Sequence, residues 1–544
     1  MNANDKKMPA DGWSGLKEHF RQDALSGFLV FMLALPLSLG IAKASDFPPI
    51  MGLITAMIGG LVVSLIAGSR LTIKGPAAGL IVIVAGAVAE LGHGDVNLGW
   101  KYALGAVVVA GAIQILFGFI RLGSLVDFFP LSAVHGMLAA IGIIIISKQT
   151  HILLGVNPKD EFGRPLVEPL ELIARLPHTL ANHSGTAALV GLSSLLIVLL
   201  WPKVKHAWIR KIPAPIVVLL LAVPLSKFLG LGQGQLVHFD HNLAETLEVD
   251  VDFGGMAQTG IFIKYVIMFA LVGSLESLLT VKAVDMLDPN HQKSDANKDL
   301  MAVGAGNMLA GVFGGLPMIS EVARSSANVS NGARTRWANF FHGAFMMIFL
   351  ILDLQFNDMI PLPALAAMLI GVGFKLASPR EFGLMAKVGI EQLIIFCTTI
   401  IVTLATDLLI GIGTGILTKL ITQLVFGAPL GAIFRAHTAR QGNTLKVAGA
   451  AVFSNWLGIK KQLIQIPRTA HASIDLSSCN LVDHTVSDNL HHLQAEFEHA
   501  GGSLRVLGLD EFKAASKSNH EHAARNKPKN NRMKLQKAKH TIRN

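Results

Sequence analysis

The chain has 544 residues, of which 51% are hydrophobic and only 15% are charged, and its formal net charge is +10. In soluble globular proteins about a quarter of the residues are charged, so this composition argues against a soluble protein. The positive charge lies in the two tails and in short connections between apolar runs, which argues against a nucleic-acid binder. Two cysteines, Cys397 and Cys479, exclude a disulfide framework.

Apolar runs follow one another from about residue 23 to residue 426. A bilayer core of about 30 Å needs about 20 mostly apolar residues per helix, and on this basis we predict fourteen membrane segments. No small-residue cleavage site follows the first run, so we expect it to be a retained span and not a signal peptide. Examples of the apolar runs, some of which reach the length of a full span and some of which fall short of it, are residues 25–41, 50–66, 103–120, 187–200, 261–271 and 392–404.

The charges of the connections predict the orientation. An even number of segments places both tails on one side, and the excess of Lys and Arg marks the cytoplasmic side of a membrane. The opposite connections are poorer in Lys and Arg, and residues 160–171 and 240–252 are acidic. We therefore predict a multi-pass protein of the inner membrane with both termini in the cytoplasm. The connections assigned to the cytoplasm carry Arg70, Lys74, Arg121, Lys203, Lys205, Arg210, Lys211, Lys293, Lys298, Arg334, Arg336, Lys375, Arg380 and Lys387.

Two segments, residues 72–79 and residues 317–328, are too short and too polar to span a bilayer. They take the third and the tenth places, which correspond in two halves of seven segments. Interrupted segments at matching positions of two halves indicate the central site of a transporter.

The chain changes character after Phe426. We predict a linker at residues 427–443, strands at residues 444–453, 472–476 and 504–507, and a helix at residues 486–500, which together form a small α/β domain. From residue 513 the chain is rich in Lys, Arg, His and Asn, and we expect it to be disordered. The predicted domains are therefore residues 1–22 (a cytoplasmic segment), 23–430 (the membrane domain), 444–512 (the α/β domain) and 513–544 (a basic tail).

The interrupted segments carry residues suited to binding an anion. The first amides of a helix are unpaired and attract anions. Proline suits the first helical turn, where its missing N–H is not needed, and small residues let an anion approach the backbone. Hydroxyl groups at the second segment add donors. The residues expected to surround the anion are Pro76, Ala77, Ala78, Gly79, Ala323, Arg324, Ser325 and Ser326.

Three charged residues lie at membrane depth. Such charges are costly and usually functional. Arg324 and Glu321 are three residues apart on one helical face, so they form either a structural pair or a site in which Arg324 attracts the anion and Glu321 tunes it. Glu276 stands in an otherwise apolar span and either takes up a proton, binds sodium or pairs with Arg324. We assign Glu276 and Glu321 to ion coupling.

Enzyme signatures are not found: the chain has no HExxH motif, phosphate loop, zinc-like Cys and His spacing or nucleophile elbow. We therefore predict neither catalytic residues nor a metal or a cofactor. Besides a transporter, two classes stay open: a membrane-embedded regulator that senses an anion, and a nucleobase transporter, against which the central Arg324 argues.

Several separated motifs follow one another in a characteristic order and spacing: residues 33–41, 75–78, 274–284, 295–307, 314–317, 323–328 and 331–336. Together they resemble the SulP family of sulfate permeases and anion transporters, over about residues 20–512. The stretch at 474–483 is similar to the STAS domain that follows the transporter in this family.

This resemblance implies a 7+7 inverted repeat of membrane helices, with a core domain that moves against a gate domain, and usually a homodimer. It implies that the anion binds between the two interrupted segments, with Arg324 at the family's basic position and Glu276 at its acidic position. Glu321 departs from the pattern, because many relatives have a small or hydroxyl residue there.

The resulting prediction is an all-α polytopic membrane protein, followed by a small α/β STAS-like domain, that transports a small inorganic anion. Sulfate and bicarbonate are the foremost substrates, dicarboxylates are the alternative, and a proton or sodium ion is the coupling ion. The expected partners are the lipid bilayer, a second copy of the chain and, for bicarbonate, a separate carbonic anhydrase, with no nucleic acid.

Overall fold

The computed structural model describes residues 10, 12–124, 129–157, 169–206, 212–237, 251–289, 293–352, 359–510, 512–515 and 523–526. The acidic connections at 160–171 and 240–252, and the basic tail beyond residue 526, lie wholly or largely outside these residues. The chain divides into two compact units, which we describe separately. The first comprises Met1–Gly123 and Ile141–Leu376, and the second Ser124–Ala140 and Ala377–Asn544.

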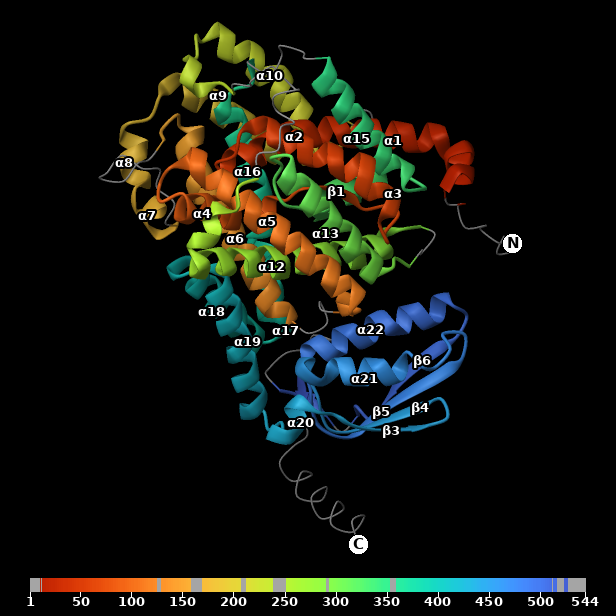
Figure 1. Ribbon diagram of the computed structural model, residues 1–544. Helices are drawn as coiled ribbons and strands as arrows, with labels where there is room; N and C mark the ends of the chain where they lie inside the picture. Colours follow the sequence, from red (N-terminus) through yellow and green to blue (C-terminus); the bar gives the residue numbers. More distant parts are fainter. Residues whose placement is uncertain are drawn as a thin grey trace. The chain divides into compact units, whose positions relative to one another are not determined.

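The first unit is almost entirely helical (Figure 1). Its two short strands, β1 and β2, interrupt the helices at the predicted broken segments. Its elements are α1 (Gly12–Ala44), α2 (Pro49–Ile58), α3 (Ser64–Ile66), β1 (Ile73–Pro76), α4 (Ile81–Leu91), α5 (Val96–Phe119), most of α6 (Leu131–Leu153), α7 (Pro169–Ala174), α8 (Leu176–Ala181), α9 (Gly185–Leu200), α10 (Ala214–Phe228), α12 (Thr259–Leu287), α13 (Ala296–Val312), β2 (Met318–Glu321), α14 (Val322–Ser330), α15 (Trp337–Ile351) and α16 (Leu362–Leu376).

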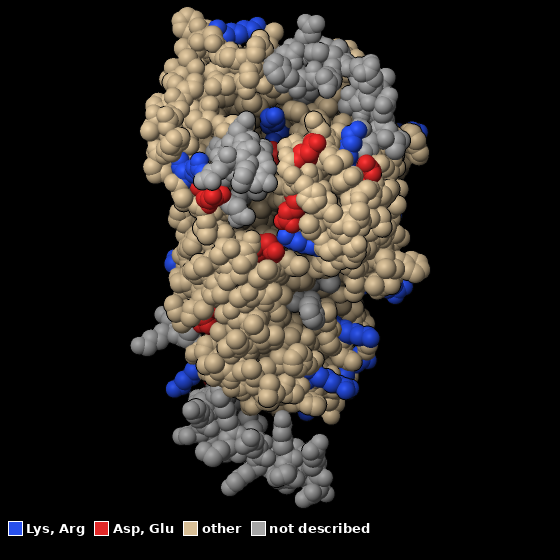
Figure 2. All heavy atoms as spheres, turned by 60° about the vertical axis from the view of Figure 1, so that its left-hand side comes forward, with Lys and Arg blue, Asp and Glu red and all other residues tan. Residues whose placement is uncertain are grey.

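Eight helical stretches of the described residues are long and apolar enough to cross a membrane, and four further apolar helices are shorter. Most of the face drawn in Figure 2 carries no charged side chain, and acidic and basic side chains gather near the middle of its upper part. The predicted polytopic membrane fold is confirmed. The first helix differs in extent: α1 begins at Gly12, because the amphipathic residues before Asp23 continue the same helix.

Small residues let the membrane helices approach one another closely. At the contact of α5 with α13, a Cβ atom on Gly111 would lie 2.6 Å from the carbonyl oxygen of Gly304, and one on Gly304 would lie 2.6 Å from the carbonyl oxygen of Gly111. Helices in a bilayer associate through such close packing, since lipid offers no hydrophobic drive between them. The pair fixes α13, which carries a residue of the site described below.

The second unit contains the last apolar helices and a six-stranded sheet. Besides the start of α6, its elements are α17 (Pro379–Val388), α18 (Ile390–Ala405), α19 (Leu408–Val425), α20 (Leu430–Phe434), β3 (His437–Gln441), β4 (Thr444–Ala451), α21 (Trp456–Leu463), β5 (His471–Val482), α22 (His484–His499), β6 (Ser503–Leu507), β7 (Lys513–Ala514) and β8 (Arg525–Asn526).

The sheet agrees with the predicted α/β domain, and its edges correct the prediction. β4, β5 and β6 run parallel, with α21 and α22 as the crossover helices that parallel strands need. The predicted linker at 427–443 is wrong, because it contains α20 and also β3, which forms a hairpin with β4. The domain also does not end at residue 512, because β8 pairs with β5 at Val482 and Leu481.

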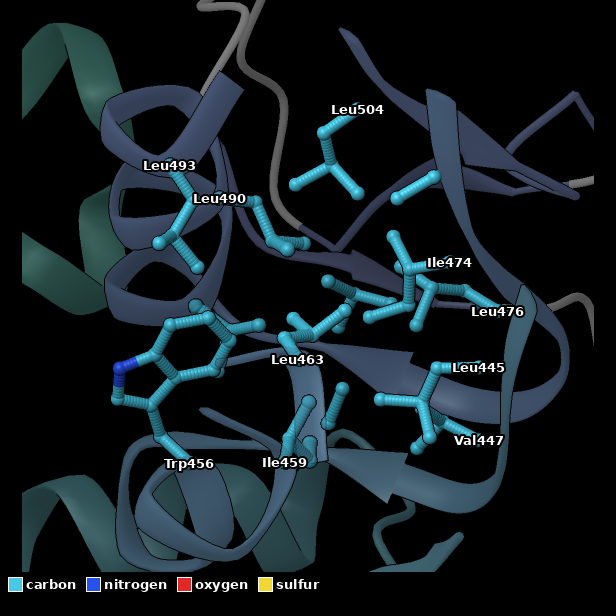
Figure 3. Close-up of a cluster of buried hydrophobic side chains, with 14 of the residues drawn as sticks. Leu445, Val447, Trp456, Ile459, Leu463, Ile474, Leu476, Leu490, Leu493 and Leu504 are labelled. Atoms are coloured by element: carbon cyan, nitrogen blue, oxygen red, sulfur yellow. The ribbon is translucent and has the colours of Figure 1, made fainter. Parts of the chain in front are cut away.

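One apolar core holds this domain together. Trp456, Ile459 and Leu463 of α21 and Leu490 and Phe497 of α22 are almost fully buried. They pack with strand residues such as Ile474 and Leu445 on the helix-covered face of the sheet (Figure 3). This core accounts for the alternating apolar pattern of β4 and β5.

A buried carboxylate joins this domain to the preceding helix α19. Asp483 caps α22: its Oδ1 accepts a hydrogen bond from the amide of Val486 (2.9 Å). Its Oδ2 accepts hydrogen bonds from Gln423 Nε2 (2.8 Å) and from the amide of Phe453 (3.0 Å). The ammonium group of Lys419, also on α19, lies 3.7 Å from the same oxygen. Asp483 therefore ties the first turn of α22 to α19.

Replacing Asp483 by Ala should destabilise the protein by about 3–5 kcal/mol, because Lys419 would stay buried without its carboxylate. Thermal unfolding of the purified full-length chain in detergent measures the effect. Asp475→Ala is the matched control, since Asp475 lies on the same domain and accepts a hydrogen bond from its neighbour Ser477. Equal losses of thermal stability in the two variants would contradict the assignment.

Candidate functional site

The two interrupted segments pair with each other. β1 and β2 form a two-stranded antiparallel sheet in which Ile73 lies opposite Glu321 and Pro76 opposite Met318. Backbone polar groups at membrane depth have no water to bind, so non-helical segments must satisfy one another. The prediction that both segments are broken is confirmed, and their pairing brings the two ends of the predicted site together.

The first segment enters its helix later than predicted. Pro76 ends β1, Ala77 has an extended backbone (φ −99°, ψ 125°), and a single 3-10 turn at Ala78–Leu80 leads into α4. Pro76 is thus a strand residue and not the first helical residue, because it is held in register opposite Met318. The buried small residues Ala77, Ala78 and Gly79 lie at the start of the helical turn, as predicted.

Glu276 of α12 lies against this start. The carboxylate of Glu276 lies directly against Gly79, where a Cβ atom would overlap it and force it to move. Glu276 is 7% exposed, and its Oε1 has no hydrogen-bond partner among the described residues. The structure therefore brings together Glu276 and the predicted residues of the first segment.

The second segment is capped by its own acidic residue. Glu321 ends β2 and precedes α14, and its Oε2 accepts a hydrogen bond from the amide of Arg324 (2.8 Å). A carboxylate at a helix N-terminus is stabilised by the unpaired amides and the helix dipole. Glu321 thus occupies an amide that the sequence analysis left free for an anion.

The hydroxyl group of Ser325 is used within the protein. It donates to the carbonyl oxygen of Glu321 (2.5 Å) and accepts from the amide of Ile73 (2.9 Å). Ser325 therefore joins α14 to β1, and the expectation that its hydroxyl group is a free donor is wrong. Ser326 is partly buried and Ala323 is exposed on the first turn of the same helix.

The guanidinium group of Arg324 is buried beside β1. Arg324 is 1% exposed, and its Nη1 and Nη2 atoms have no hydrogen-bond partner among the described residues. The group lies against β1, since a Cβ atom on Gly75 would be 2.6 Å from Nη1. Glu321 contacts the backbone amide of Arg324 and not its side chain, so the geometry does not support a structural pair of the two side chains.

The charges of the site do not balance. Glu321 interacts electrostatically both with Arg324 and with Glu276, so the site groups one cation with two carboxylates. In a medium of low dielectric, unbalanced charges interact strongly. The arrangement can bind an anion at the guanidinium group and a proton or a metal cation at the carboxylates.

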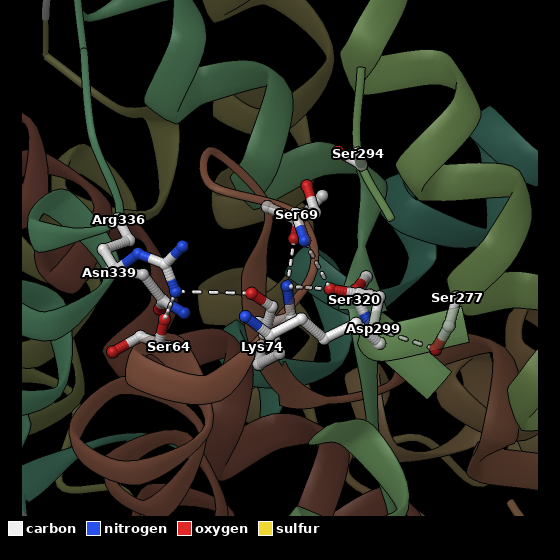
Figure 4. Close-up of polar contacts among 12 residues, drawn as sticks. Ser64, Ser69, Lys74, Ser277, Ser294, Asp299, Ser320, Arg336 and Asn339 are labelled. Atoms are coloured by element: carbon white, nitrogen blue, oxygen red, sulfur yellow. Dashed lines mark hydrogen bonds and ion pairs between the residues drawn. The ribbon is translucent and has the colours of Figure 1, made fainter. Parts of the chain in front are cut away.

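Lys74 was predicted as a charge of a cytoplasmic loop, and this is wrong. It is a fully buried residue of β1, and its ammonium group lies 2.9 Å from Asp299 Oδ1 of α13 and contacts Thr72 Oγ1. Asp299 also accepts hydrogen bonds from the amide of Ser69 (2.9 Å) and from Ser320 Oγ of β2 (3.1 Å) (Figure 4). One carboxylate therefore holds both strands of the crossing. The position of Lys74 directly before Gly75 and Pro76, inside a segment predicted to be broken, was the signal available in the sequence.

A second polar network that the sequence analysis missed holds the other end of β2. Asn307 of α13 accepts a hydrogen bond from the amide of Met318 (2.6 Å) and donates to Gln114 of α5 (2.7 Å). Gln114 donates in turn to Ser274 Oγ on α12 (3.4 Å), two residues before Glu276. The network connects β2 to the helix that carries the acidic residue of the site.

Replacing Lys74 by Met should cost about 3–5 kcal/mol of stability, because Asp299 would be left buried without its cation. The double variant Lys74→Met with Asp299→Asn should recover a large part, since the amide still accepts the hydrogen bond of Ser69. Thermal unfolding in detergent measures both. Lys264→Met, which breaks a half-exposed pair with Glu90 at 3.0 Å, should cost about 1 kcal/mol or less. A Lys74 variant as stable as the Lys264 variant would refute the structural role.

Two interrupted helical segments that pair through β1 and β2 within a bundle of apolar helices, beside a buried cation, are typical of membrane transporters. The comparison with known families agrees. The profile of the sulfate permease family matches residues 20–399, and the chain belongs to this family.

The relatives include transporters with two kinds of anion in their names. YvdB of Bacillus subtilis, which carries a provisional sulfate-transporter name, is 27% identical over 401 residues, which are 74% of this chain and 73% of that protein. The bicarbonate transporter BicA of Synechocystis is 26% identical over 421 residues, which are 74% of this chain and 69% of BicA.

Solved structures share the fold. The transmembrane domain of a cyanobacterial bicarbonate transporter BicA superposes with a TM-score of 0.64 at 24% identity, covering 72% of this chain and 97% of that chain. The structure of SLC26A9 superposes with a TM-score of 0.65 at 14% identity, covering 91% of this chain and 85% of that chain. The predicted fold class is confirmed.

Proposed function

We propose that this protein is a secondary active transporter that carries a small inorganic anion, sulfate or bicarbonate, across the cytoplasmic membrane. The names of its relatives support both substrates. The anion would be held at the crossing of β1 and β2, between the start of the turn at Ala78–Leu80 and the start of α14.

The observation that carries this proposal is the unpaired guanidinium group of Arg324. A buried cation without a partner is costly, and the cost is removed when a counter-ion enters. A guanidinium group offers several N–H donors in a planar fork that matches the geometry of an oxyanion. The amides at Ala78 and Gly79, at the start of the first helical turn, add donors of partial positive charge.

Glu276 is the proposed coupling group. Its carboxylate is buried beside the anion site, and Oε1 has no hydrogen-bond partner among the described residues. A proton or a sodium ion at this carboxylate would remove its repulsion of the anion, so the two ions would bind together. Coupling to a proton or sodium gradient follows from that mutual stabilisation.

The placement in the cell belongs to the same proposal. Both tails would lie in the cytoplasm, with residues 23–430 as the transport domain and residues 444–512, extended by β7 and β8, as a STAS-like domain. The family resemblance supports a homodimer. A separate carbonic anhydrase would supply or consume the substrate if that substrate is bicarbonate.

Uptake of radiolabelled sulfate, bicarbonate and fumarate into proteoliposomes tests the function. Arg324→Gln should lower the apparent affinity for the transported anion about 10- to 100-fold, because a hydrogen bond to a charged group contributes about 1.5–3 kcal/mol. Arg175→Gln is the matched control and should behave as the wild type, because Arg175 directly precedes the short helix α8 and is not a residue of the proposed site. A wild type that carries none of the three anions would refute the proposal.

Glu276→Gln tests the coupling. The amide fills the same space beside Gly79 but takes up neither a proton nor sodium, so uptake should no longer respond to an imposed pH or sodium gradient. Glu90→Gln is the control, since Glu90 lies on α4 and pairs with the half-exposed Lys264. If Glu276→Gln keeps the gradient dependence of the wild type, Glu276 is not the coupling group.

A further inference from the structure

The N-terminus of α14 is capped by a carboxylate of the protein itself, that of Glu321. α14 has nine residues, and Glu321 stands at its N-cap with an extended backbone (φ −103°, ψ 123°). Its carboxylate accepts the hydrogen bond of the Arg324 amide at 2.8 Å. A substrate that binds the amides at this helix start must therefore compete with a carboxylate tethered beside them.

The backbone amide of Arg324 has a protein partner, whereas the Nη atoms of its side chain have none among the described residues. The amide is bound by Glu321, whereas the guanidinium group lies against Gly75 of β1, almost fully buried, with Nη1 and Nη2 unpartnered among the described residues. An entering anion thus finds a free guanidinium group and an amide that is taken. Binding at the first does not by itself displace Glu321 from the second.

Glu321 is partly exposed, whereas the backbone directly before it is held by buried contacts. Ser320, directly before it, is fully buried and bound to Asp299 Oδ2 (3.1 Å) and Ser277 Oγ (3.2 Å). Glu321 itself is partly exposed, and Val322, directly after it, is 49% exposed. The carboxylate therefore stands at the exposed edge of the start of α14.

Charge then decides which anion is accepted. With Arg324, Glu276 and Glu321 all charged, the site has a net charge of −1 before the substrate enters, and a coupling cation at Glu276 brings it to zero. In either case Glu321 contributes one negative charge next to the substrate. At an effective dielectric constant of 20, two unit charges about 4 Å apart interact by about 4 kcal/mol, and a dianion meets twice the repulsion of a monoanion.

We infer that Glu321 is a specificity-determining residue that makes this site selective for a singly charged oxyanion, of the class of bicarbonate, over a doubly charged one, of the class of sulfate. This inference rests on the proposed function and names its substrate class. Removing the charge of Glu321 raises the charge of the site by one, and this change favours the dianion.

The test compares initial uptake of radiolabelled sulfate and bicarbonate into proteoliposomes that contain the full-length protein. In Glu321→Gln and Glu321→Ser the ratio of sulfate to bicarbonate uptake should rise about tenfold or more, since a fraction of the Coulomb energy between close charges corresponds to a factor of ten. Glu321→Asp keeps the charge and should keep the ratio of the wild type. Asp95→Asn is the matched control: Asp95 caps α5 through the amides of Asn97 and Leu98, and its loss should not alter the ratio.

The outcomes separate this inference from the proposed function. A wild type that transports both anions, with an unchanged ratio in Glu321→Gln and Glu321→Ser, would overturn the inference and leave the transporter proposal intact. A wild type that prefers sulfate would also overturn it. A wild type that carries no anion removes the proposed function, and the inference falls with it.

Discussion

Backbone hydrogen bonding at membrane depth is the constraint on which the transport unit depends. A segment that leaves the helical conformation in a bilayer exposes donors and acceptors that lipid does not satisfy. Here two such segments satisfy each other as β1 and β2, and the surrounding helices supply the remaining partners. Asp299 fixes both strands, Asn307 fixes the start of β2, and Ser325 bonds the amide of Ile73. The crossing is thereby rigid, and the two helix starts that emerge from it keep a defined separation.

The sequence predicted what depends on local composition. Residues 72–79 and 317–328 interrupt apolar runs with Gly, Pro and charged residues, so both breaks were visible. Arg324 and Glu276 were found because a charge within an apolar run is rare. These predictions required no knowledge of which segments touch.

Features that depend on pairing between distant segments were missed. Lys74 resembles a loop charge until β1 is placed beside α13, where Asp299 receives it. Glu321 and Arg324 were expected to meet through their side chains, since they are three residues apart on a helix. In the structure Glu321 precedes the helix, and its carboxylate reaches the backbone amide instead. Whether Glu321 lies in the helix or before it depends on the residue at which α14 begins. That residue is set by the register in which β2 pairs with β1. A sequence alone does not reveal that register.

The buried cations of the described residues differ in whether a protein group pairs with them. Among the described residues, four Lys and Arg side chains are buried: Lys74, Arg324, Arg336 and Lys419. Lys74 pairs with Asp299, Lys419 lies 3.7 Å from Asp483, and Arg336 donates to the carbonyl oxygens of Ser64, Leu65 and Ala67 at the end of α3.

Each of these three cations joins elements at a place where the backbone changes direction, and its cost of burial is offset by the protein. The Nη atoms of Arg324 have no such partner among the described residues, although Glu321 stands three residues earlier in the chain. Burying an unpaired charge is unfavourable, and a counter-ion that binds to it removes part of that cost. Under the proposed function, the transported anion would supply the counter-charge of Arg324.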